Sequence, residues 1–185
     1  MTRNQEPITW EEYRTLAEAA HEHSLRSGFT VYLLGYTGMR RSEAAHFTRD
    51  WFDPDLPAVW IPKTQNGWSP KSEYCARDIP LSPFAANNIE KYLDELSDEE
   101  NVFNVAPQTI NRRINRVTQD LDLGHITPCK IRHMYANKLL SQGVSKPIMA
   151  AVLGLRTNYF TSTSENVYLH SNDWNWPAEE KLDLW

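Results

Sequence analysis

Short apolar stretches, several of them preceded by a residue that can cap a helix, divide most of this chain into predicted helices. Thr9 and Glu12 form a capping box, in which each side chain can bond the backbone N–H of the other residue, so a first helix is predicted at Trp10–His23. Ser82 followed by Pro83 favours the start of another helix, which is expected to end near Leu96. Further helices are predicted at about Gly28–Tyr36, Arg41–Phe47, Gln108–Leu121, Pro128–Gln142 and Ser145–Leu153, the last capped by Ser145, with short helices around Tyr168 and at Pro177–Leu184.

Two apolar stretches between the third and fourth predicted helices have the length of strands. They are Ala58–Pro62 and Arg77–Leu81, and the turn-forming pairs Asn66-Gly67 and Ser69-Pro70 lie between them. This pattern predicts a hairpin or a three-stranded edge sheet. The expected fold class is therefore mainly α with a small antiparallel β-sheet (α+β), in a single domain over residues 1–185.

The composition is that of an ordinary globular protein. Of the 185 residues, 41% are hydrophobic and 23% are charged. The longest apolar runs fall far below the ~18 residues that cross a bilayer, and no apolar signal segment is visible at the N-terminus. Cys75 and Cys129 form neither a disulfide framework nor a zinc set, and no metal or cofactor is expected. We expect the protein to work in the cytoplasm, or inside a host cell if a virus or plasmid encodes it, and without a membrane.

The charge of the chain is unevenly distributed. A net charge of −5 disfavours nucleic acid as a partner. Between Asn104 and Ala150, however, basic residues outnumber the two acids, Asp120 and Asp122. Either a DNA-facing surface or an ordinary solvated face accounts for this basic stretch. Its basic residues are Arg112, Arg113, Arg116, Lys130, Arg132, Lys138 and Lys146.

Several short motifs carry residue types that suit chemistry on a phosphodiester. Arginine offers paired donors to phosphate oxygens and keeps its charge, lysine can act as a general acid, and tyrosine can act as a nucleophile. In chain order the motifs are Thr37-Gly38-Met39-Arg40-Arg41-Ser42-Glu43, then Lys71 ahead of Arg77-Asp78-Ile79-Pro80-Leu81, then Thr127-Pro128-Cys129-Lys130-Ile131-Arg132-His133, then Gly143 with Ile148 and Val152-Leu153-Gly154-Leu155, and last Tyr168-Leu169-His170.

The order and spacing of these motifs resemble those of the catalytic domain of tyrosine recombinases, the phage-integrase family. The resemblance covers roughly Thr9–His170. It implies the catalytic-domain fold of that family and a site-specific DNA recombinase or integrase, with the N-terminal core-binding domain of the family absent. It also implies double-stranded DNA and a homotetramer on DNA as partners. Residues 171–185 would then be a C-terminal docking segment, the alternative being an aromatic flap over the protein's own core.

The resemblance also assigns the catalytic roles. Arg40 and Arg132 match the arginines that clamp the scissile phosphate and stabilise its added charge. Lys71 matches the lysine that protonates the leaving 5′-oxygen, and Tyr168 matches the nucleophile that forms a 3′-phosphotyrosine. No metal or ATP is needed, because the covalent link stores the energy of the cleaved bond.

Some positions leave alternatives open. Lys63 is the alternative to Lys71, and Tyr159 is the alternative nucleophile. Cys129 and Leu155 occupy positions at which the family has a histidine and a histidine or tryptophan. His125 or Lys130 would have to compensate for the first, and Arg156 for the second. The residues expected to contact DNA are Arg112, Arg113, Arg116, Lys130 and Arg156.

The two departures from the family pattern also leave two other functions open. One is a DNA-binding protein of the same fold that has lost the chemistry. The other is an enzyme like the type IB topoisomerases, which relaxes supercoils by the same chemistry without pairing two sites.

Overall fold

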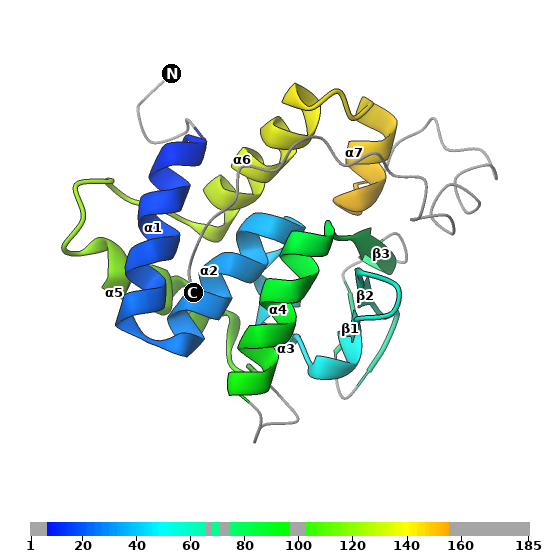
Figure 1. The fold of residues 1–185 in the computed structure, drawn as a ribbon, viewed down its shortest axis with the longest axis horizontal. Coiled ribbons are helices and arrows are strands. Elements are labelled where there is room, and N and C mark those ends of the chain that lie inside the picture. Colours follow the sequence, from blue (N-terminus) through cyan, green and yellow to red (C-terminus); the bar gives the residue numbers. More distant parts are fainter. Residues whose placement is uncertain (1–6, 66–67, 71–74, 97–102, 156–185) are drawn as a thin grey trace.

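A computed structural model describes residues 7–65, 68–70, 75–96 and 103–155 of the chain. The described residues form helices arranged around α2 and a small sheet to one side of them (Figure 1). The helices are α1 (Trp10–His23), α2 (Leu25–Thr37), α3 (Arg41–His46), α4 (Pro83–Glu95), α5 (Pro107–Thr118), α6 (Pro128–Ser141) and α7 (Lys146–Val152), with a 3-10 turn η1 (Arg49–Trp51); the strands are β1 (Phe52–Asp53), β2 (Ala58–Ile61) and β3 (Arg77–Pro80).

Local hydrogen bonds explain where the first two helices begin and end. The Thr9–Glu12 capping box is present, with Thr9 N donating to Glu12 Oε2 at 2.7 Å and Glu12 N donating to Thr9 Oγ1 at 3.1 Å. Ser24 ends α1 by donating its N–H to Ala20 O, and its side chain caps α2 by accepting from Ser27 N at 3.2 Å. The two helices therefore follow each other directly and pack side by side.

Gly38 ends α2 in a left-handed conformation, with a φ of 60°. A Cβ at this position would come within 2.4 Å of Cδ1 of Tyr135 on α6. Glycine is therefore required twice, by the backbone angle and by the close approach of α6. This turn leads directly into Arg40, so its shape sets where the arginine stands.

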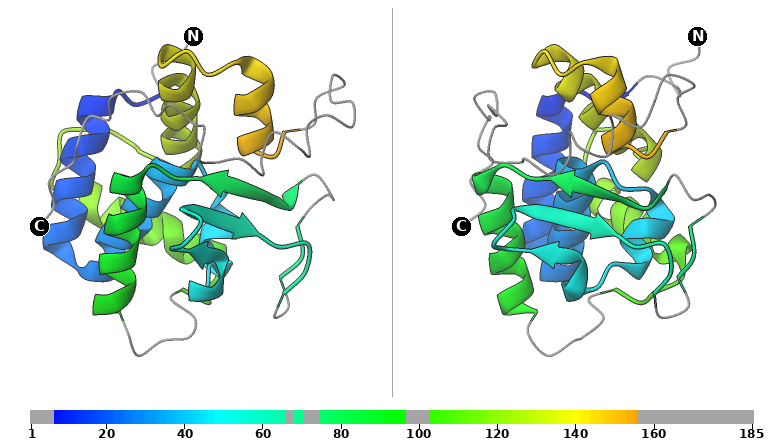
Figure 2. Two further views of the ribbon diagram at one scale, coloured as in Figure 1. Left: turned by 45° about the vertical axis from the view of Figure 1, so that its right-hand side comes forward. Right: turned by 90° about the vertical axis from the view of Figure 1, so that its right-hand side faces the viewer.

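The three strands form one antiparallel sheet in the order β1-β2-β3 (Figure 2). Val59 of β2 is paired with Ile79 of β3, and both are fully buried. On the other face Trp60, which is 48% exposed, is paired with Asp78. Helix α7 packs against β3, so the sheet and the C-terminal end of the described chain meet.

The core is built around α2, whose described side chains are buried from Ser27 onward. Helices α1, α3, α4, α5 and α6 all contact it. Aromatic rings fill much of the space: Tyr32 stacks on Tyr36 with ring centroids 4.3 Å apart, and Phe29 stacks on Tyr92 at 5.3 Å. Burial raises the pKa of Tyr13 and Tyr92 above the ordinary value for tyrosine, so these phenols are neutral core groups.

The structure confirms the predicted fold class, a mainly helical protein with a small antiparallel sheet, and three strands form the sheet. Helix α1 has the predicted bounds, while α2 begins three residues earlier than predicted because Ser24 caps it. Ser145 occupies the N-cap position of α7, but its side chain makes no capping hydrogen bond, so its predicted capping role is wrong. The helices predicted around Tyr168 and at Pro177–Leu184 lie outside the described residues.

The remaining helix ends differ from the prediction by a few residues. Helix α3 ends at His46 because Phe47 turns into an extended conformation, and α5 ends at Thr118, ahead of Leu121. Helices α4, α6 and α7 each end one residue before the predicted position. No helix among the described residues has the length and apolar character needed to cross a membrane.

Candidate active site

Arg40 stands at the N-terminal end of α3, directly after the turn that closes α2. Its backbone N donates to Glu43 Oε2 at 2.8 Å, and its Nη1 donates to Glu43 Oε1 at 2.9 Å. Its Nη2 donates to the carbonyl oxygen of Gly154 at 2.7 Å. The side chain remains 30% exposed. Arg40 is thus held from two sides while its side chain stays partly exposed.

Arg132 reaches the same place from α6. Its Nη1 donates to the carbonyl oxygen of Gly38 at 2.6 Å, and its Nη2 donates to that of Leu153 at 2.5 Å. Gly38 lies two residues before Arg40, and Leu153 precedes the glycine whose carbonyl Arg40 binds. The structure therefore brings together two arginines that are far apart in the sequence, because both bind backbone carbonyls of the turn after α7.

A buried ion pair between Arg77 and Glu43 fixes the carboxylate that binds Arg40. Arg77, the first residue of β3, donates from Nη1 to Glu43 Oε1 and from Nη2 to Glu43 Oε2, both at 2.9 Å. The side chains of Arg77 and Glu43 are only 5% and 1% exposed. Burial would raise the pKa of the Glu43 carboxyl, but hydrogen bonds and charge from Arg77 and Arg40 outweigh it, so that pKa lies below the ordinary value.

We call Arg40, Glu43, Arg77 and Arg132 the arginine cluster. Two guanidinium groups, those of Arg40 and Arg77, bond the one carboxylate, and the charge of Arg132 also acts on the cluster, so the cluster keeps a net positive charge. Burial, reinforced by the charges of Arg40 and Arg77, lowers the pKa of Arg132 to about 10. Arg132 remains a cation at neutral pH, and an anion placed beside it would relieve the repulsion. The electrostatics of the cluster therefore suit a phosphate group.

Comparison with known proteins agrees with these motifs and this geometry. The family model described as "Phage integrase family" matches residues 6–174 of the chain. The chain belongs to the phage integrase family. The match takes in all the motifs from Thr37 to His170, including those that lie outside the described residues.

Curated relatives of this family member are named tyrosine recombinases. A tyrosine recombinase of Thermosipho africanus is 28% identical over 95% of this chain and 59% of its own length. Tyrosine recombinase XerA of Thermococcus kodakarensis is 26% identical, over 80% of this chain and 53% of its own, and XerC of Staphylococcus epidermidis is 27% identical, over 74% and 48%. The chain thus spans about half the length of these relatives.

A solved structure supports the same fold assignment. The crystal structure of a XerA recombinase superposes on this phage integrase family member with a TM-score of 0.66 and 18% sequence identity. The match covers 95% of this chain and 67% of that chain. At this identity the likeness is one of fold, and it confirms the predicted catalytic-domain fold.

The two positions that depart from the family pattern lie at the edges of the arginine cluster. Cys129 is an exposed free thiol on α6, one turn before Arg132. Leu155 is 46% exposed and directly follows Gly154. Of the two residues expected to compensate for Cys129, Lys130 directs its Nζ to the carbonyl oxygen of His125 at 2.9 Å. Neither a thiol nor a leucine side chain replaces the hydrogen-bonding capacity of an imidazole.

The basic residues predicted to contact DNA differ in how they are placed. Arg112 and Arg116 of α5 are exposed. Arg113, between them, points inward: its Nη1 donates to Thr30 Oγ1 at 3.2 Å, and its guanidinium lies 5.1 Å from the centre of the Phe103 ring. Lys71, Tyr168 and Arg156 lie outside the described residues, as does the alternative nucleophile Tyr159.

Sequence reasoning missed Glu43 and Arg77 as site residues. Both stand in motifs that were recognised, at the end of the Arg40 motif and at the start of the Arg77–Leu81 strand. One signal would have found them. Each of two neighbouring motifs has a charged residue at a position that the local pattern predicts to be buried. Such residues are rarely buried unless they are paired.

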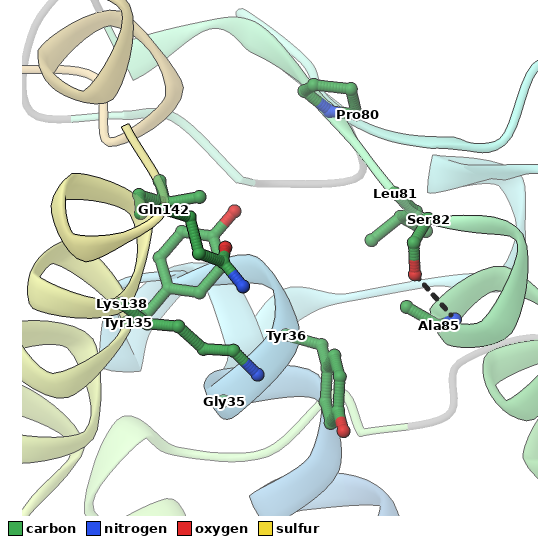
Figure 3. A pocket seen from close by; sticks show the side chains of 10 residues that line it. Gly35, Tyr36, Pro80, Leu81, Ser82, Ala85, Tyr135, Lys138 and Gln142 are labelled. Carbon is green, nitrogen blue, oxygen red and sulfur yellow. Dashed lines mark hydrogen bonds between the residues drawn. The ribbon is translucent and has the colours of Figure 1, made fainter. Parts of the chain in front are cut away.

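A small pocket near the cluster is too narrow to hold a nucleotide. It lies between α2, α6 and the start of α4; Tyr36, Lys138 and Gln142 are among its lining residues, and Ser82 Oγ accepts a hydrogen bond from Ala85 N beside it (Figure 3). Its volume is about 20 Å³, which is roughly the space of a single water molecule. A DNA phosphate therefore does not fit this pocket, whereas the side chain of Arg40 in the arginine cluster is partly exposed.

Proposed function

We propose that this chain cleaves and rejoins double-stranded DNA as the catalytic domain of a site-specific recombinase. In the proposed reaction, the phenolic oxygen of Tyr168 attacks the phosphorus of a phosphodiester and forms a 3′-phosphotyrosine. The 5′-oxygen leaves as a hydroxyl after taking a proton from Lys71. A 5′-hydroxyl from a second strand then attacks the phosphotyrosine and releases Tyr168, so the bond is rejoined without ATP.

One observation carries this proposal: two guanidinium groups from separate helices converge on neighbouring backbone carbonyls. Arg40 binds the carbonyl oxygen of Gly154 directly, and Arg132 binds that of Leu153 directly. Both groups are therefore held in place before any substrate binds, which is how a site stabilises charge that develops in the transition state. In this proposal the transferred phosphoryl group carries that charge on its non-bridging oxygens, which bind N–H groups of Arg40 and Arg132 that have no acceptor among the described residues.

Membership of the phage integrase family supports the same proposal, as do relatives named tyrosine recombinases. In this proposal double-stranded DNA is the substrate, and Arg112 and Arg116, which are exposed, contact its backbone together with Arg156. A homotetramer on two duplexes, with residues 171–185 docked on a neighbouring protomer, is the proposed working form.

The test is a covalent adduct on nicked DNA. The probe is a pool of duplexes with a randomised centre and a nick a few nucleotides from it, so that cleavage releases a short strand and traps the protein on the DNA. We expect an adduct that survives denaturing electrophoresis with the wild-type chain and none with Tyr168→Phe. Tyr159→Phe is the matched control and should retain the adduct. Loss with Tyr159→Phe alone would move the nucleophile to Tyr159.

A second candidate function is DNA binding without chemistry, which the exposed Cys129 and Leu155 favour. Neither side chain offers the donor that the family pattern has there. In this case the wild-type chain would retard the duplex pool in a native gel and form no adduct. If an adduct forms, exchange between two selected sites indicates a recombinase, whereas relaxation of a supercoiled plasmid without exchange indicates a topoisomerase-like enzyme.

A further inference from the structure

Arg77 connects three segments of the chain that each contribute to the arginine cluster. From the first position of β3, its Nε donates to the carbonyl oxygen of Val152 at 2.6 Å, and its Nη1 also donates to that of Cys75 at 2.8 Å. The remaining contacts are the two 2.9 Å bonds to Glu43. At 5% exposure, the guanidinium is directed at protein acceptors and is shielded from a substrate.

Glu43 links Arg77 to Arg40, so the position of Arg77 affects that of Arg40. Its Oε1 accepts from Nη1 of both arginines, and its Oε2 accepts from Nη2 of Arg77 and from the backbone N of Arg40. Each carboxylate oxygen is thus shared between the buried arginine and the partly exposed one. Because a bidentate pair fixes the plane of the carboxylate, Arg77 determines the direction from which Glu43 holds Arg40.

Gly154 shows how closely the two guanidiniums are packed. A Cβ at this residue would lie 3.1 Å from both Cδ and Nη1 of Arg77 and 3.2 Å from Nη1 of Arg40. The residue also has a φ of 61°, which glycine adopts without strain. The turn after α7 therefore binds Arg40 through the Gly154 carbonyl, while the missing side chain makes room for both arginines.

We infer that Arg77 is a positioning residue of the phosphate clamp, by which we mean Arg40 and Arg132. Arg77 acts on Arg40 through Glu43, and it acts on Arg132 through the Val152 carbonyl, which directly precedes the turn that binds Arg132. The inference rests on the proposed DNA cleavage and adds a residue that touches no reacting atom. Its origin on β3 matters, because this strand follows the segment that contains Lys71. The clamp and the strand that follows the predicted general acid are thereby joined by one side chain.

The experiment compares Arg77→Lys with the wild-type chain on two nicked duplexes of the same selected sequence. One has an ordinary scissile phosphate, and the other has a methylphosphonate there, which lacks the negative charge that an arginine clamp neutralises. Arg77→Lys keeps the charge but loses the planar fork that binds Glu43 and Val152 together. On the phosphate duplex we expect adduct formation to be slower by ~10²-fold, as for a reacting group displaced by about 1 Å, with DNA affinity changed by less than about two-fold.

On the methylphosphonate duplex, the rate of adduct formation by Arg77→Lys should be within about ten-fold of the wild-type rate, because an uncharged centre depends less on the clamp. Lys71→Ala is the contrasting variant. Its rate of adduct formation should fall by the same factor on both duplexes, because protonation of the leaving oxygen does not depend on the negative charge of the scissile phosphate. Arg49→Gln is the matched arginine control. Arg49 also bonds a carboxylate, that of Asp94, and a backbone carbonyl, that of Leu93, but it lies outside the arginine cluster. The rate of adduct formation by this variant should equal that of the wild type.

Gly154→Ala tests the inference without removing a charge, in case Arg77→Lys lowers the yield of folded protein. Its methyl group would press on both guanidiniums, so it should show the same smaller loss on the methylphosphonate duplex. Equal losses on both duplexes for Arg77→Lys and Gly154→Ala would overturn the inference and leave the proposed function standing. An absence of adduct with the wild-type chain on both duplexes would overturn the proposed function, and the inference with it.

Discussion

Arg40 and Arg132 belong to the same cluster, yet the protein compensates their charges in different ways. Arg40 has a carboxylate partner, Glu43, which binds both its backbone N and its Nη1. Arg132 is bound by two backbone carbonyls, and among the described residues no carboxylate forms an ion pair with it. Carbonyl dipoles fix the direction of a guanidinium but do not cancel its charge.

This difference separates a structural side of the cluster from an electrostatic one. On the side of Glu43, a buried carboxylate organises the starts of α3 and β3, so removing that carboxylate should cost stability in addition to displacing Arg40. On the side of Arg132, burial and neighbouring cations lower the pKa to about 10, which means that the folded protein holds this charge at some cost. A change there should mainly reduce the attraction for a phosphate.

Glu43→Gln should give the largest effect on folding. It leaves Arg40 and Arg77 buried or half-buried without their carboxylate, and breaking a buried pair in this way typically costs about 3–5 kcal/mol of unfolding free energy. Chemical denaturation monitored by circular dichroism measures the loss. Glu18→Gln, which affects only the exposed pair with Arg14, is the control and should change stability by less than about 1 kcal/mol. Similar losses for the two variants would contradict a buried, organising role for Glu43.

The pH dependence of stability gives a second view of the same carboxylate. Its pKa in the folded protein lies below the ordinary value of 4.5. The unfolded chain therefore binds the proton more readily, and the stability that Glu43 contributes is complete above pH 4.5 and is lost as the pH falls through the lower folded pKa. Denaturation midpoints of wild type and Glu43→Gln should accordingly converge in acid. A gap that stays constant down to the lowest pH would contradict this titration.

Arg132→Gln should show the opposite balance, with a large effect on rate and a small one on folding. Removing one donor that stabilises charge in a transition state costs about 10²–10³-fold in rate. The carbonyls of Gly38 and Leu153 lose their partner, which lowers the unfolding free energy by about 1–2 kcal/mol. Adduct formation on the nicked duplex and denaturation on the same preparation measure both quantities. A stability loss as large as that of Glu43→Gln, or an unchanged rate, would remove the contrast between the two sides.

Inorganic phosphate should detect the uncompensated charge without any DNA. A ligand that binds only the folded state stabilises it, by about 1.4 kcal/mol at roughly ten times its Kd. We expect phosphate to raise the thermal midpoint of the wild-type chain more than chloride at equal ionic strength does. Arg132→Gln should lose most of this rise. If Arg132→Gln retains it, the anion binds elsewhere, and the assignment of the charge deficit to Arg132 is wrong.

The fold was largely predictable because its signals are local. The Thr9–Glu12 capping box and the Ser82-Pro83 start each act within a few residues, and the helices they predict are present. The end of α5 was placed less well, at Leu121 and not at the observed Thr118. Strand positions were predicted, but the pairing of Val59 with Ile79 depends on packing against the core.

The site was predictable only where one motif contained the whole signal. Arg40 and Arg132 each lie in a recognised motif, and the structure joins them. The partnership of Glu43 with Arg77 spans 34 residues and depends on how β3 meets α3, which no local pattern encodes. Charged residues within a motif also suggest exposure by default, so a buried pair is the feature that sequence reasoning misses most easily.

The smallest expected effect comes from Arg49, an arginine outside the cluster whose charge is paired but exposed. Arg49 lies 3.4 Å from Asp94, with side chains 45% and 68% exposed, so solvent screens this pair. Arg49→Gln should change the unfolding free energy by less than about 1 kcal/mol and leave phosphate stabilisation intact. Measured beside Glu43→Gln and Arg132→Gln, it separates burial from the mere presence of an ion pair. If Arg49→Gln lost nearly as much unfolding free energy as Glu43→Gln, pairing and not burial would set the energetic cost of removing a charge. The two sides of the cluster would then differ only in the number of their partners.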